Sequence, residues 1–416
     1  MCKREVVEGN RAKQLVFVTT KGSRRVGWSA QFFIMSRDTV LAAELPTIDN
    51  PHDPRVWLES IDGDKALDWV RENNVDVLKH LGNPTEQPVY KRILAYLDSK
   101  KKITYVGRVL DHGSGYRYYN VWTDNTHKQG LWRRCMPDEY QKKEPQWETV
   151  LDLDALSKEE GMTWVWAGSV VPDLEADDGI TKRVLIKLSA AGADAVHVRE
   201  FDLEKKTFVP AADGGFVLEG GKTIVSWKDR DTLLVGGTLL GPDKITASGY
   251  ARTTCEWLRG TPLSSAVEVF AGMHSDVQVA AYTCLDRAHR FSFRMRCTTF
   301  YDTAQELLLG PEGFGPSESA KGYRTIRVPD NAQAGTHADQ LILTLRSEWL
   351  GYKSGTLLAA PAAAFLDASD DEAIKALLTP IFEPTDRCTL EGAGDCVRAS
   401  ARLRSPLPTS AHLRPR

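Results

Sequence analysis

Two segments near the start of the chain carry apolar residues at helical spacing. The first, DKALDWVRENNVDVLKHLGNP, spaces its apolar positions from Leu67 to Leu81 along one face and stops at a Gly and a Pro. The second, TEQPVYKRILAYLDSKKK, forms an apolar stripe from Val89 to Leu97 behind a start signal at Thr85. The pattern therefore predicts two helices ahead of the main body of the chain.

From Ile103 onward the apolar period changes to two. In ITYVGRVLDHGSGYRYYNVWTD, apolar and polar residues alternate around the turn signal DHGSG, which predicts a β-hairpin. Short strand candidates follow as far as Phe382, separated by Gly, Asp, Asn or Pro; they include WETVLDLDAL, TIVSWKDRDTLLVGG, VQVAAYTCL, FSFRMRCTTFYDTAQELLLG and ADQLILTLRSEW. The pattern predicts no long helix in this region.

Grouped in fours, these strand candidates repeat at roughly 45 to 50 residues, which is near the blade period of a β-propeller. The strings VLDLDAL (Val150–Leu156) and REFDLEKKTFV (Arg199–Val209) show the sequence type that often ends such a unit. The spacing predicts about five to six blades between Ile103 and Phe382. A set of β-sandwiches is the alternative that the repeat leaves open.

Composition narrows the class of protein. With 42% hydrophobic and 26% charged residues among 416, the chain has the composition of a soluble globular protein. No stretch reaches the roughly 18 apolar residues that a membrane span needs. Seven scattered cysteines without a CxxC pair favour a reducing, cytoplasmic setting. The apolar stretch Val26–Ser36 starts well inside the chain, so we expect no secretion signal, and Glu5 and Glu8 count against an organellar transit peptide.

The net charge of −3 is unevenly distributed. Residues 1–48 hold eight Lys or Arg against four Asp or Glu, residues 387–416 hold six against two, and the body between them carries −11. An acidic body counts against nucleic acid as a partner. We expect residues 1–48 to be an extension with the basic composition of a solvated tail, 49–102 a helical segment, 103–386 the blades, and 387–416 a disordered tail.

The opening of the helical segment is the most specific motif. The string DPRVWLES resembles the N-terminal half of the prolyl oligopeptidase family of serine peptidases. Four further strings add to the resemblance: ALDWVRENN, YVGRVLDHGSGYRYYNVWTDNTHKQGLWRR, PQWETVLDLDAL and GYARTTCEWLRGTPL. The family's D-P-[YF]-R-W-L-E opening is matched, with Val56 as an insertion, by Asp53, Pro54, Arg55, Trp57, Leu58 and Glu59. The helix motif W-V-x-x-x-N is met by Trp69, Val70 and Asn74 or Asn73. The resemblance covers about Asp49 to Thr385.

The resemblance implies a mainly β fold, in which two N-terminal helices precede a seven-bladed propeller and an α/β-hydrolase domain with a Ser-Asp-His triad follows. In the family the propeller admits short peptides to a serine endopeptidase site. We expect this chain to hold an incomplete propeller, to lack the hydrolase domain as a truncated product, and to be inactive without that intramolecular partner. A stand-alone propeller that serves as a protein-interaction scaffold is the alternative.

Candidate nucleophiles and bases are weak in this sequence. No serine stands in a complete G-x-S-x-G elbow; in GPSES, Ser317 follows Gly315, but Ser319 replaces the second glycine. We interpret Ser317 as a surface-loop residue. His52 and Asp53 are neighbours on an extended segment, so their side chains are expected to point apart. We therefore predict no catalytic residue.

Binding residues are equally hard to assign. The carboxylate clusters Asp173–Gly179 and Asp367–Glu372 lack the order of a calcium loop, and we interpret both as solvated loops. Packing between blades is the favoured role of the tryptophans, although ligand stacking is the alternative; the set includes Trp122, Trp132, Trp147, Trp164, Trp166 and Trp227. We predict no metal and no cofactor, and the sequence assigns no substrate-binding residue.

Overall fold

The computed structural model describes residues 53–60, 62–172, 181–286, 289–309, 322–386, 388–393 and 411–415. The chain divides into two compact units, residues 1–91 and 92–416. We describe each unit by itself. The N-terminal extension of residues 1–48 lies outside the described residues.

The first unit is helical. A short 3-10 helix, η1 (Val56–Glu59), precedes α2 (Asp64–Leu81), which ends at Gly82 with a φ of 76°. A left-handed backbone of this kind is readily adopted by glycine, which explains the stop signal in the sequence. Trp57 contacts Trp69 edge to face, with ring centroids 6.4 Å apart. The first predicted helix is therefore confirmed.

The second predicted helix is also present, as α3 (Pro88–Leu97). It begins three residues later than the start signal at Thr85 indicated, because residues 84–86 form a separate 3-10 turn, η2 (Pro84–Glu86). The Asn83 side chain caps that turn by accepting a hydrogen bond from the backbone N–H of Thr85 at 3.1 Å. The second compact unit begins within α3, at Arg92.

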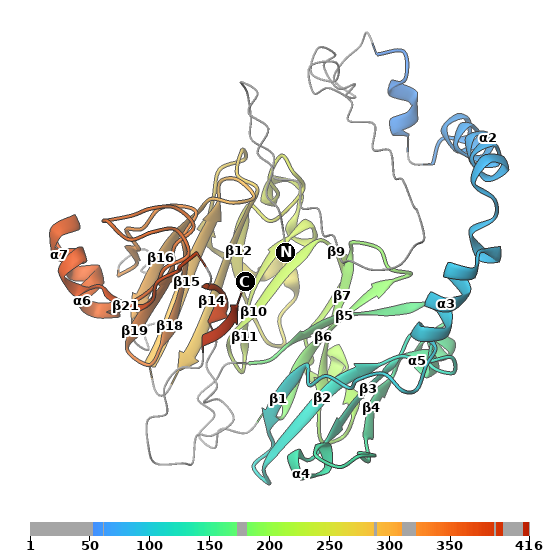
Figure 1. Cartoon of the computed structure of the whole chain (residues 1–416), viewed down its shortest axis with the longest axis horizontal. Helices are drawn as coiled ribbons and strands as arrows, with labels where there is room; N and C mark the ends of the chain where they lie inside the picture. Colours follow the sequence, from blue (N-terminus) through green and yellow to red (C-terminus); the bar gives the residue numbers. More distant parts are fainter. Residues whose placement is uncertain are drawn as a thin grey trace. The chain divides into compact units, whose positions relative to one another are not determined.

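In the described residues, the second unit contains five antiparallel sheets of four or five strands, which follow one another along the chain and which we call blades 1 to 5 (Figure 1). Blades 1, 3, 4 and 5 have four strands each, and blade 2 has a fifth strand because β8 and β9 both pair with β7. The strands of blades 1 and 2 are β1 (Arg108–Asp111), β2 (Tyr116–Trp122), β3 (Leu131–Cys135), β4 (Glu148–Asp152), β5 (Trp164–Val170), β6 (Arg183–Ala190), β7 (Val196–Asp202), β8 (Thr207–Phe208) and β9 (Val217–Gly221). The predicted propeller architecture is confirmed, with five blades described rather than the seven of the family resemblance.

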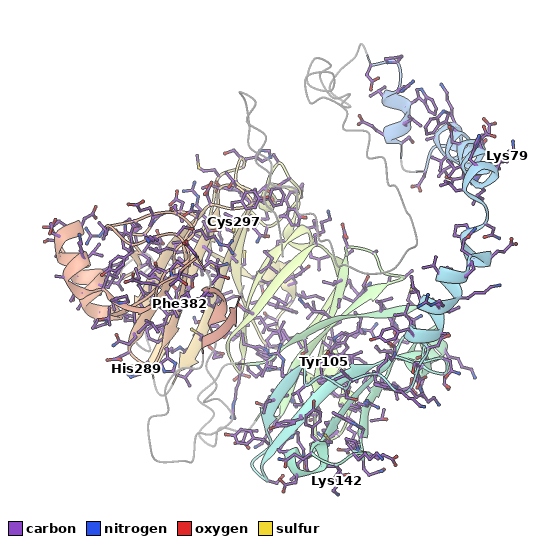
Figure 2. The ribbon with its side chains drawn as sticks, in the orientation of Figure 1. Lys79, Tyr105, Lys142, His289, Cys297 and Phe382 are labelled. Atoms are coloured by element: carbon purple, nitrogen blue, oxygen red, sulfur yellow. The ribbon has the colours of Figure 1, made fainter. Side chains whose placement is uncertain are left out.

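The remaining blades follow the same meander. Their strands are β10 (Thr223–Asp229), β11 (Thr232–Gly237), β12 (Thr253–Leu258), β13 (Val267–Ala271), β14 (Gln278–Asp286), β15 (His289–Cys297), β16 (Thr303–Leu309), β17 (Arg324–Thr325), β18 (Gln333–His337), β19 (Gln340–Thr344), β20 (Leu357–Pro361) and β21 (Thr379–Phe382). His289 and Cys297 mark opposite ends of β15 (Figure 2). Each blade is thus a sequential sheet, as expected when a short turn joins neighbouring antiparallel strands.

Four short α-helices lie among the strands in the described part of residues 103–386. The string WETVLDLDAL was interpreted as one strand, but it divides into β4 and α5 (Leu153–Glu160). The Asp152 side chain accepts a hydrogen bond from the Ala155 N–H at 2.9 Å, so a cap ends the strand and starts the helix. The other short helices are α4 (Pro137–Tyr140), α6 (Ala362–Asp367) and α7 (Asp371–Leu377).

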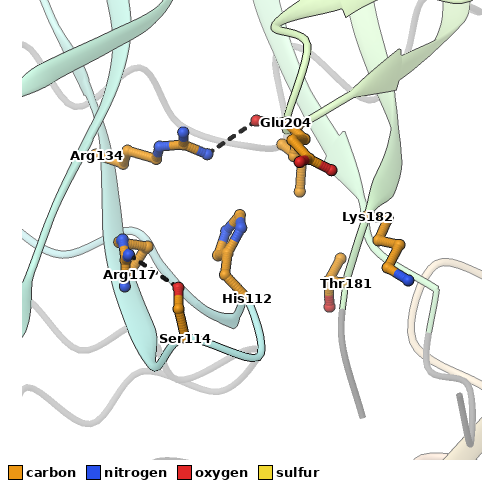
Figure 3. Close-up of a pocket in the computed structure, with 8 residues that line it drawn as sticks. His112, Ser114, Arg117, Arg134, Thr181, Lys182 and Glu204 are labelled. Carbon is orange, nitrogen blue, oxygen red and sulfur yellow. Dashed lines mark hydrogen bonds between the residues drawn. The ribbon is translucent and has the colours of Figure 1, made fainter. Parts of the chain in front are cut away.

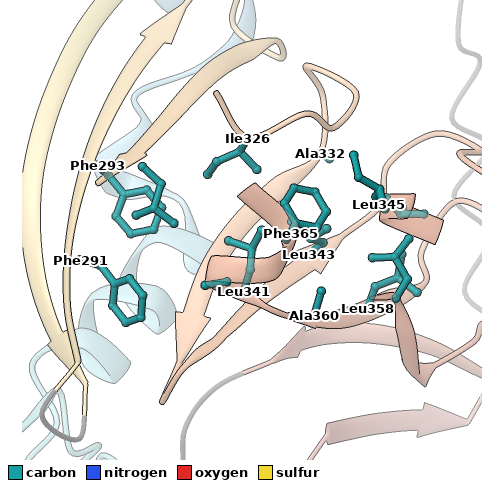
Figure 4. Close-up of a cluster of buried hydrophobic side chains, with 14 residues drawn as sticks. Phe291, Phe293, Ile326, Ala332, Leu341, Leu343, Leu345, Leu358, Ala360 and Phe365 are labelled. Carbon is teal, nitrogen blue, oxygen red and sulfur yellow. The ribbon is translucent and has the colours of Figure 1, made fainter. Parts of the chain in front are cut away.

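The hydrophobic core lies between consecutive blades. One buried cluster joins blades 1 and 2, a second joins blades 2 and 3, a small third joins blades 3 and 4, and a fourth joins blades 4 and 5. In the fourth, Phe291 and Phe293 of β15 lie with Leu341 and Leu343 of β19 and with Phe365 of α6 (Figure 4). None of these clusters, within the described part of the chain, combines blade 5 with blade 1. The blades therefore hold together as a sequential stack.

Hydrogen bonds also join the first strands of neighbouring blades. Arg108 of β1 donates to the Ser169 carbonyl of β5 at 3.4 Å. The Ser226 hydroxyl of β10 donates to the Ala281 carbonyl of β14 at 2.8 Å. Since side-chain donors satisfy backbone carbonyls here, the blades are fixed in register by polar as well as apolar contacts.

The segment after Arg387 differs in part from its prediction. Although the sequence pattern indicates no strand there, β22 (Cys388–Ala393) pairs antiparallel with β23 (Ala411–Pro415). Apolar and polar residues alternate over only four positions in each strand, Cys388–Glu391 and Ala411–Arg414, so the periodic signal is short. Residues 394–410 lie outside the described residues.

Candidate functional site

A pocket of about 270 Å³ lies between blades 1 and 2 (Figure 3). Four of its lining residues come from blade 1 and its turns, and four come from the segments that flank β6 and follow β7. They are His112, Ser114, Arg117, Arg134, Thr181, Lys182, Leu203 and Glu204. A volume of this size suits a small polar molecule rather than a drug-sized one, whose pockets measure roughly 300 to 1,000 Å³.

Hydrogen bonds between the two blades and within blade 2 hold the walls of the pocket. The Thr181 N–H donates to the Asp111 carbonyl at 2.9 Å, and Arg134 Nη1 donates to the Leu203 carbonyl at 2.9 Å. The Leu203 N–H donates in turn to the Lys182 carbonyl at 2.9 Å. The pocket is therefore built into the junction of the blades.

A hydrogen-bonded chain orients the imidazole of His112. Arg134 Nη1 lies 3.3 Å from the hydroxyl of Tyr119, which lies 2.8 Å from Nε2 of His112. Because the guanidinium can only donate, the Tyr119 hydroxyl accepts from Arg134, and a further hydrogen bond joins this hydroxyl to Nε2 of His112. The figure shows His112 lying between the side chains of the two blades (Figure 3).

Charged side chains of both signs surround His112. Burial, followed by the nearby charges of Arg134 and Arg117, lowers the pKa of His112 to about 4. Arg134 holds Glu148 by two hydrogen bonds, of 2.6 and 3.2 Å, and this pairing, aided by Lys206, lowers the pKa of Glu148 to about 2. Among the described lining residues, Arg117, Arg134 and Lys182 are cationic and Glu204 is anionic.

Sequence reasoning missed this site. The DHGSG turn was interpreted only as a hairpin signal, and nothing in the local pattern separates Arg117 and Arg134 from other strand arginines. Lys182 and Glu204 follow in segments that are distant in the chain. No local signal marks these residues as a group, because Arg117 and Arg134 come together only once β1, β2 and β3 are paired.

The structure places the tryptophans in packing roles. Trp132 and Trp164 are buried in the cluster between blades 1 and 2, with Trp166 packed against it, and Trp227 is buried between blades 2 and 3. The packing interpretation is confirmed for these residues. Trp122 and Trp147 instead flank Arg133, whose guanidinium carbon lies 4.3 and 4.6 Å from the two ring centroids.

The other candidates either serve local structure or lie outside the described residues. Asp370 caps α7 by accepting from the Ala373 N–H at 2.9 Å, and Asp367 pairs with Arg324. No group of His, Cys, Asp or Glu in the described residues is arranged to hold a metal ion. Ser317, His52 and the cluster Asp173–Gly179 lie outside the described residues. Among the helices that the structure describes, none has the length and apolar character needed to cross a bilayer.

The comparison with protein families is decisive. The sequence profile of the prolyl oligopeptidase N-terminal β-propeller domain matches residues 44–292. The chain belongs to the prolyl oligopeptidase family. Two relatives of the same kind are an uncharacterised peptidase of Sinorhizobium fredii, 34% identical over 346 residues, and one of Rickettsia prowazekii, 31% identical over 349 residues. These matches cover 82% and 80% of this chain but 45% and 46% of the relatives.

Solved structures of prolyl oligopeptidase relatives are similar in fold to this chain. A post-proline cleaving enzyme from Rickettsia typhi is similar at a TM-score of 0.67 and 28% identity, over 81% of this chain and 48% of that chain. Oligopeptidase B from Leishmania major, at a TM-score of 0.54 and 11% identity over 82% of this chain and 43% of that one, shares the fold. The chain therefore spans about half the length of the relatives it matches.

Proposed function

We propose that this chain supplies the propeller part of a prolyl-oligopeptidase-type serine peptidase and restricts the active site to short peptides. The observation that carries this proposal is the five-bladed stack, which aligns with half of a post-proline cleaving enzyme at 28% identity. In a closed propeller the blades surround a central channel, and a narrow channel excludes folded proteins by size.

The chemistry would come from a separate hydrolase portion. No serine in this sequence stands in a G-x-S-x-G elbow, which positions a nucleophile on a strained turn beside an oxyanion hole. In such a peptidase, the serine attacks the carbonyl carbon of a prolyl residue, a histidine takes the hydroxyl proton, and backbone N–H groups stabilise the oxyanion. The propeller contributes access and positioning rather than a reacting group.

A complementation assay tests the proposal. The purified chain is mixed with the separately produced remaining half of the Rickettsia typhi enzyme and a chromogenic peptide that contains proline. We expect no hydrolysis by the chain alone, hydrolysis by the mixture, and poor cleavage of a folded protein that contains the same sequence. The hydrolase half by itself is the control, and it should not distinguish the two substrates by size.

Two outcomes would contradict the proposal. The first is fold-dependent labelling of this chain by a fluorophosphonate probe at one serine, Ser317 for example, which would give the chain its own nucleophile. The second is equal cleavage of short and folded substrates by the mixture. Failure of the two halves to associate would favour the interaction-scaffold alternative.

A further inference from the structure

We propose that Arg133 binds the carboxylate of a glutamate or aspartate side chain, carried by a polypeptide segment that packs on the face of blade 1 directed away from blade 2. The inference goes beyond the proposed function and rests on contacts within blades 1 to 3. Three features support it: how the guanidinium is held, which hydrogen bonds it makes, and how similarly placed arginines are used in the next two blades.

Two aromatic rings and one amide hold the Arg133 guanidinium in a fixed plane. Its carbon lies 4.3 Å from the ring centroid of Trp122 and 4.6 Å from that of Trp147. Its Nε donates at 2.9 Å to Oδ1 of Asn120, the residue that pairs with Arg133 across β2 and β3. Because the group is already ordered, the edge formed by Nη1 and Nη2 is preorganised to bind a carboxylate through two hydrogen bonds.

Arg133 lies on the face of blade 1 that is directed away from the core between blades 1 and 2. Its neighbour on β3, Trp132, is buried in that core, and so is Tyr119, the neighbour of Asn120 on β2. Side chains alternate between the two faces of a strand. The hydrogen-bonded pair of Asn120 and Arg133 therefore belongs to the opposite face.

No carboxylate among the described residues forms a hydrogen bond or an ion pair with Arg133. Its side chain donates there to the Asn120 amide alone. The buried carboxylate of Asp124 acts on it through space, but the Trp122 indole and backbone N–H groups hold the oxygens of Asp124. Burial lowers the pKa of Arg133 to about 10 and outweighs the opposing effects of Cys135 and Asp124. A carboxylate on the exposed edge would offset this cost of burial.

Blade 2 shows a similarly stacked arginine with its carboxylate in place. Arg199 lies on β7, the third strand of blade 2, as Arg133 lies on the third strand of blade 1. Its guanidinium carbon is 4.9 and 5.5 Å from the ring centroids of Trp164 and Phe208. It donates to both carboxylate oxygens of Glu160, at 2.7 and 3.0 Å. Glu160 belongs to α5, which precedes the first strand of blade 2.

Blade 3 repeats the arrangement. Arg259 directly follows β12, the third strand, and its guanidinium carbon lies 4.4 Å from the ring centroid of Phe216. It donates to Glu200 of blade 2 at 2.7 Å and to Asp231 of its own blade at 2.9 Å. In blades 2 and 3, the stacked arginine thus binds a carboxylate from a residue that precedes the blade. By this repeat, the partner of Arg133 is an acidic side chain on a segment packed against blade 1.

The surroundings of Arg133 also suit a polypeptide partner. Tyr140 contacts Tyr118 and Trp147, with ring centroids 5.5 and 6.1 Å apart, so aromatic side chains continue the surface beside the guanidinium. Trp, Tyr and Arg are the residue types that most often dominate the binding energy of protein interfaces. The composition of this surface therefore fits a packed polypeptide segment better than it fits a free anion.

The experiment titrates the full chain with acetyl-Gly-Glu-Gly-amide and follows the indole NMR signals of Trp122 and Trp147. The uncharged acetyl-Gly-Gln-Gly-amide should bind about tenfold more weakly, because the charge-assisted hydrogen bonds are lost. Equal binding of the two peptides, or unchanged indole signals with both, would overturn the proposal. This comparison uses the wild-type chain, so it decides the matter even if a variant fails to fold.

A variant then tests the guanidinium itself. Arg133→Lys keeps the charge but removes the planar fork, and we expect it to weaken binding of the glutamate peptide about tenfold. Arg346→Lys is the matched control, because it makes the same substitution at an exposed position between β19 and β20, and it should leave the affinity unchanged. Equal affinities of the two variants would count against Arg133 as the binding residue.

Two further measurements test the source of the carboxylate. Acetate that binds as tightly as the glutamate peptide would overturn the assignment to a polypeptide segment and favour a free carboxylate. Self-association in sedimentation that Arg133→Lys abolishes, and Arg346→Lys does not, would support the site and identify a second copy of this chain as the source.

Discussion

Trp227 Nε1 donates a hydrogen bond to the Val170 carbonyl at 3.1 Å, which joins the first strand of blade 3 to the first strand of blade 2. The indole is 4% exposed and belongs to the core cluster between these blades. The Trp227 side chain therefore packs in the apolar core and also donates a hydrogen bond to a backbone carbonyl of the neighbouring blade.

Replacing Trp227 with Phe should destabilise the chain. The ring that remains fills most of the space, but the Val170 carbonyl loses its donor, which costs about 1–3 kcal/mol when a group is buried. Chemical denaturation measures the change in the free energy of unfolding. Trp69→Phe is the control, because Trp69 is 43% exposed, and we expect it to change the free energy by less than about 0.5 kcal/mol. Equal effects would refute the role of the inter-blade bond.

A buried carboxylate joins blades 2 and 3. Glu200 is fully buried; it pairs with Arg183 at 3.1 Å and Arg259 at 2.7 Å, and accepts from the Phe216 N–H at 2.9 Å. Glu200→Gln removes the charge that both guanidinium groups face, and we expect a loss of about 3–5 kcal/mol. Glu219→Gln, which removes the exposed partner of His197, should cost less than about 1 kcal/mol. A small effect at both positions in denaturation experiments would contradict this account.

Stability should depend on pH through His112. The ordinary pKa of 6.5 applies to the unfolded chain, whereas the folded pKa is about 4, because burial, Arg134 and Arg117 outweigh Asp111 and Glu148. The unfolded chain therefore binds the proton first as the pH falls, and stability declines from about pH 6.5 toward pH 4. Denaturation across this window should show a shallower decline in His112→Gln, which cannot take up the proton.

The exposed His80 gives the matched control, and His80→Gln should leave the pH profile unchanged. Glu148 titrates in a different window, since its folded pKa of about 2 is below the ordinary 4.5, and its contribution is lost only as the pH falls from 4.5 toward 2. Identical profiles for the wild type and His112→Gln between pH 6.5 and 4 would show that the imidazole is not responsible.

The helices carry exposed apolar residues that should promote association. On α2, Leu78 and Leu81 are 45% and 75% exposed. Exposed apolar patches of this kind mark interaction surfaces, which agrees with the proposal that a hydrolase portion is a partner. The double variant Leu78→Lys/Leu81→Lys should bind less hydrophobic dye and sediment as a more uniform species, while helix content is kept because lysine is favourable in a last turn.

Leu258→Lys on blade 3 is the control for that experiment, since Leu258 is 55% exposed and lies outside the helices. It should leave dye binding nearly unchanged. A sharp monomeric peak with low dye binding from the wild-type chain would contradict the prediction and favour the stand-alone scaffold.

The sequence by itself determined the local architecture. Apolar spacing at 3.6 and then two residues, with turn signals between, predicted both helices and the series of hairpins, because these patterns reflect which face of each element is buried. The opening motif around Trp57 indicated the family. A strand without alternating apolar and polar residues, such as β18 (Gln333–His337), was not predicted. The end of one predicted strand is instead the helix α5, which begins after the cap at Asp152.

Only the tertiary structure decided which distant residues meet. Glu200 and Arg259 belong to different blades, as do His112 and Lys182, and no local period relates their positions. Their contacts depend on how twisted sheets stack and on the angle between blades, which side-chain packing across the whole unit fixes. The pocket between blades 1 and 2 depends on that stacking, so it is recognised only in the tertiary structure.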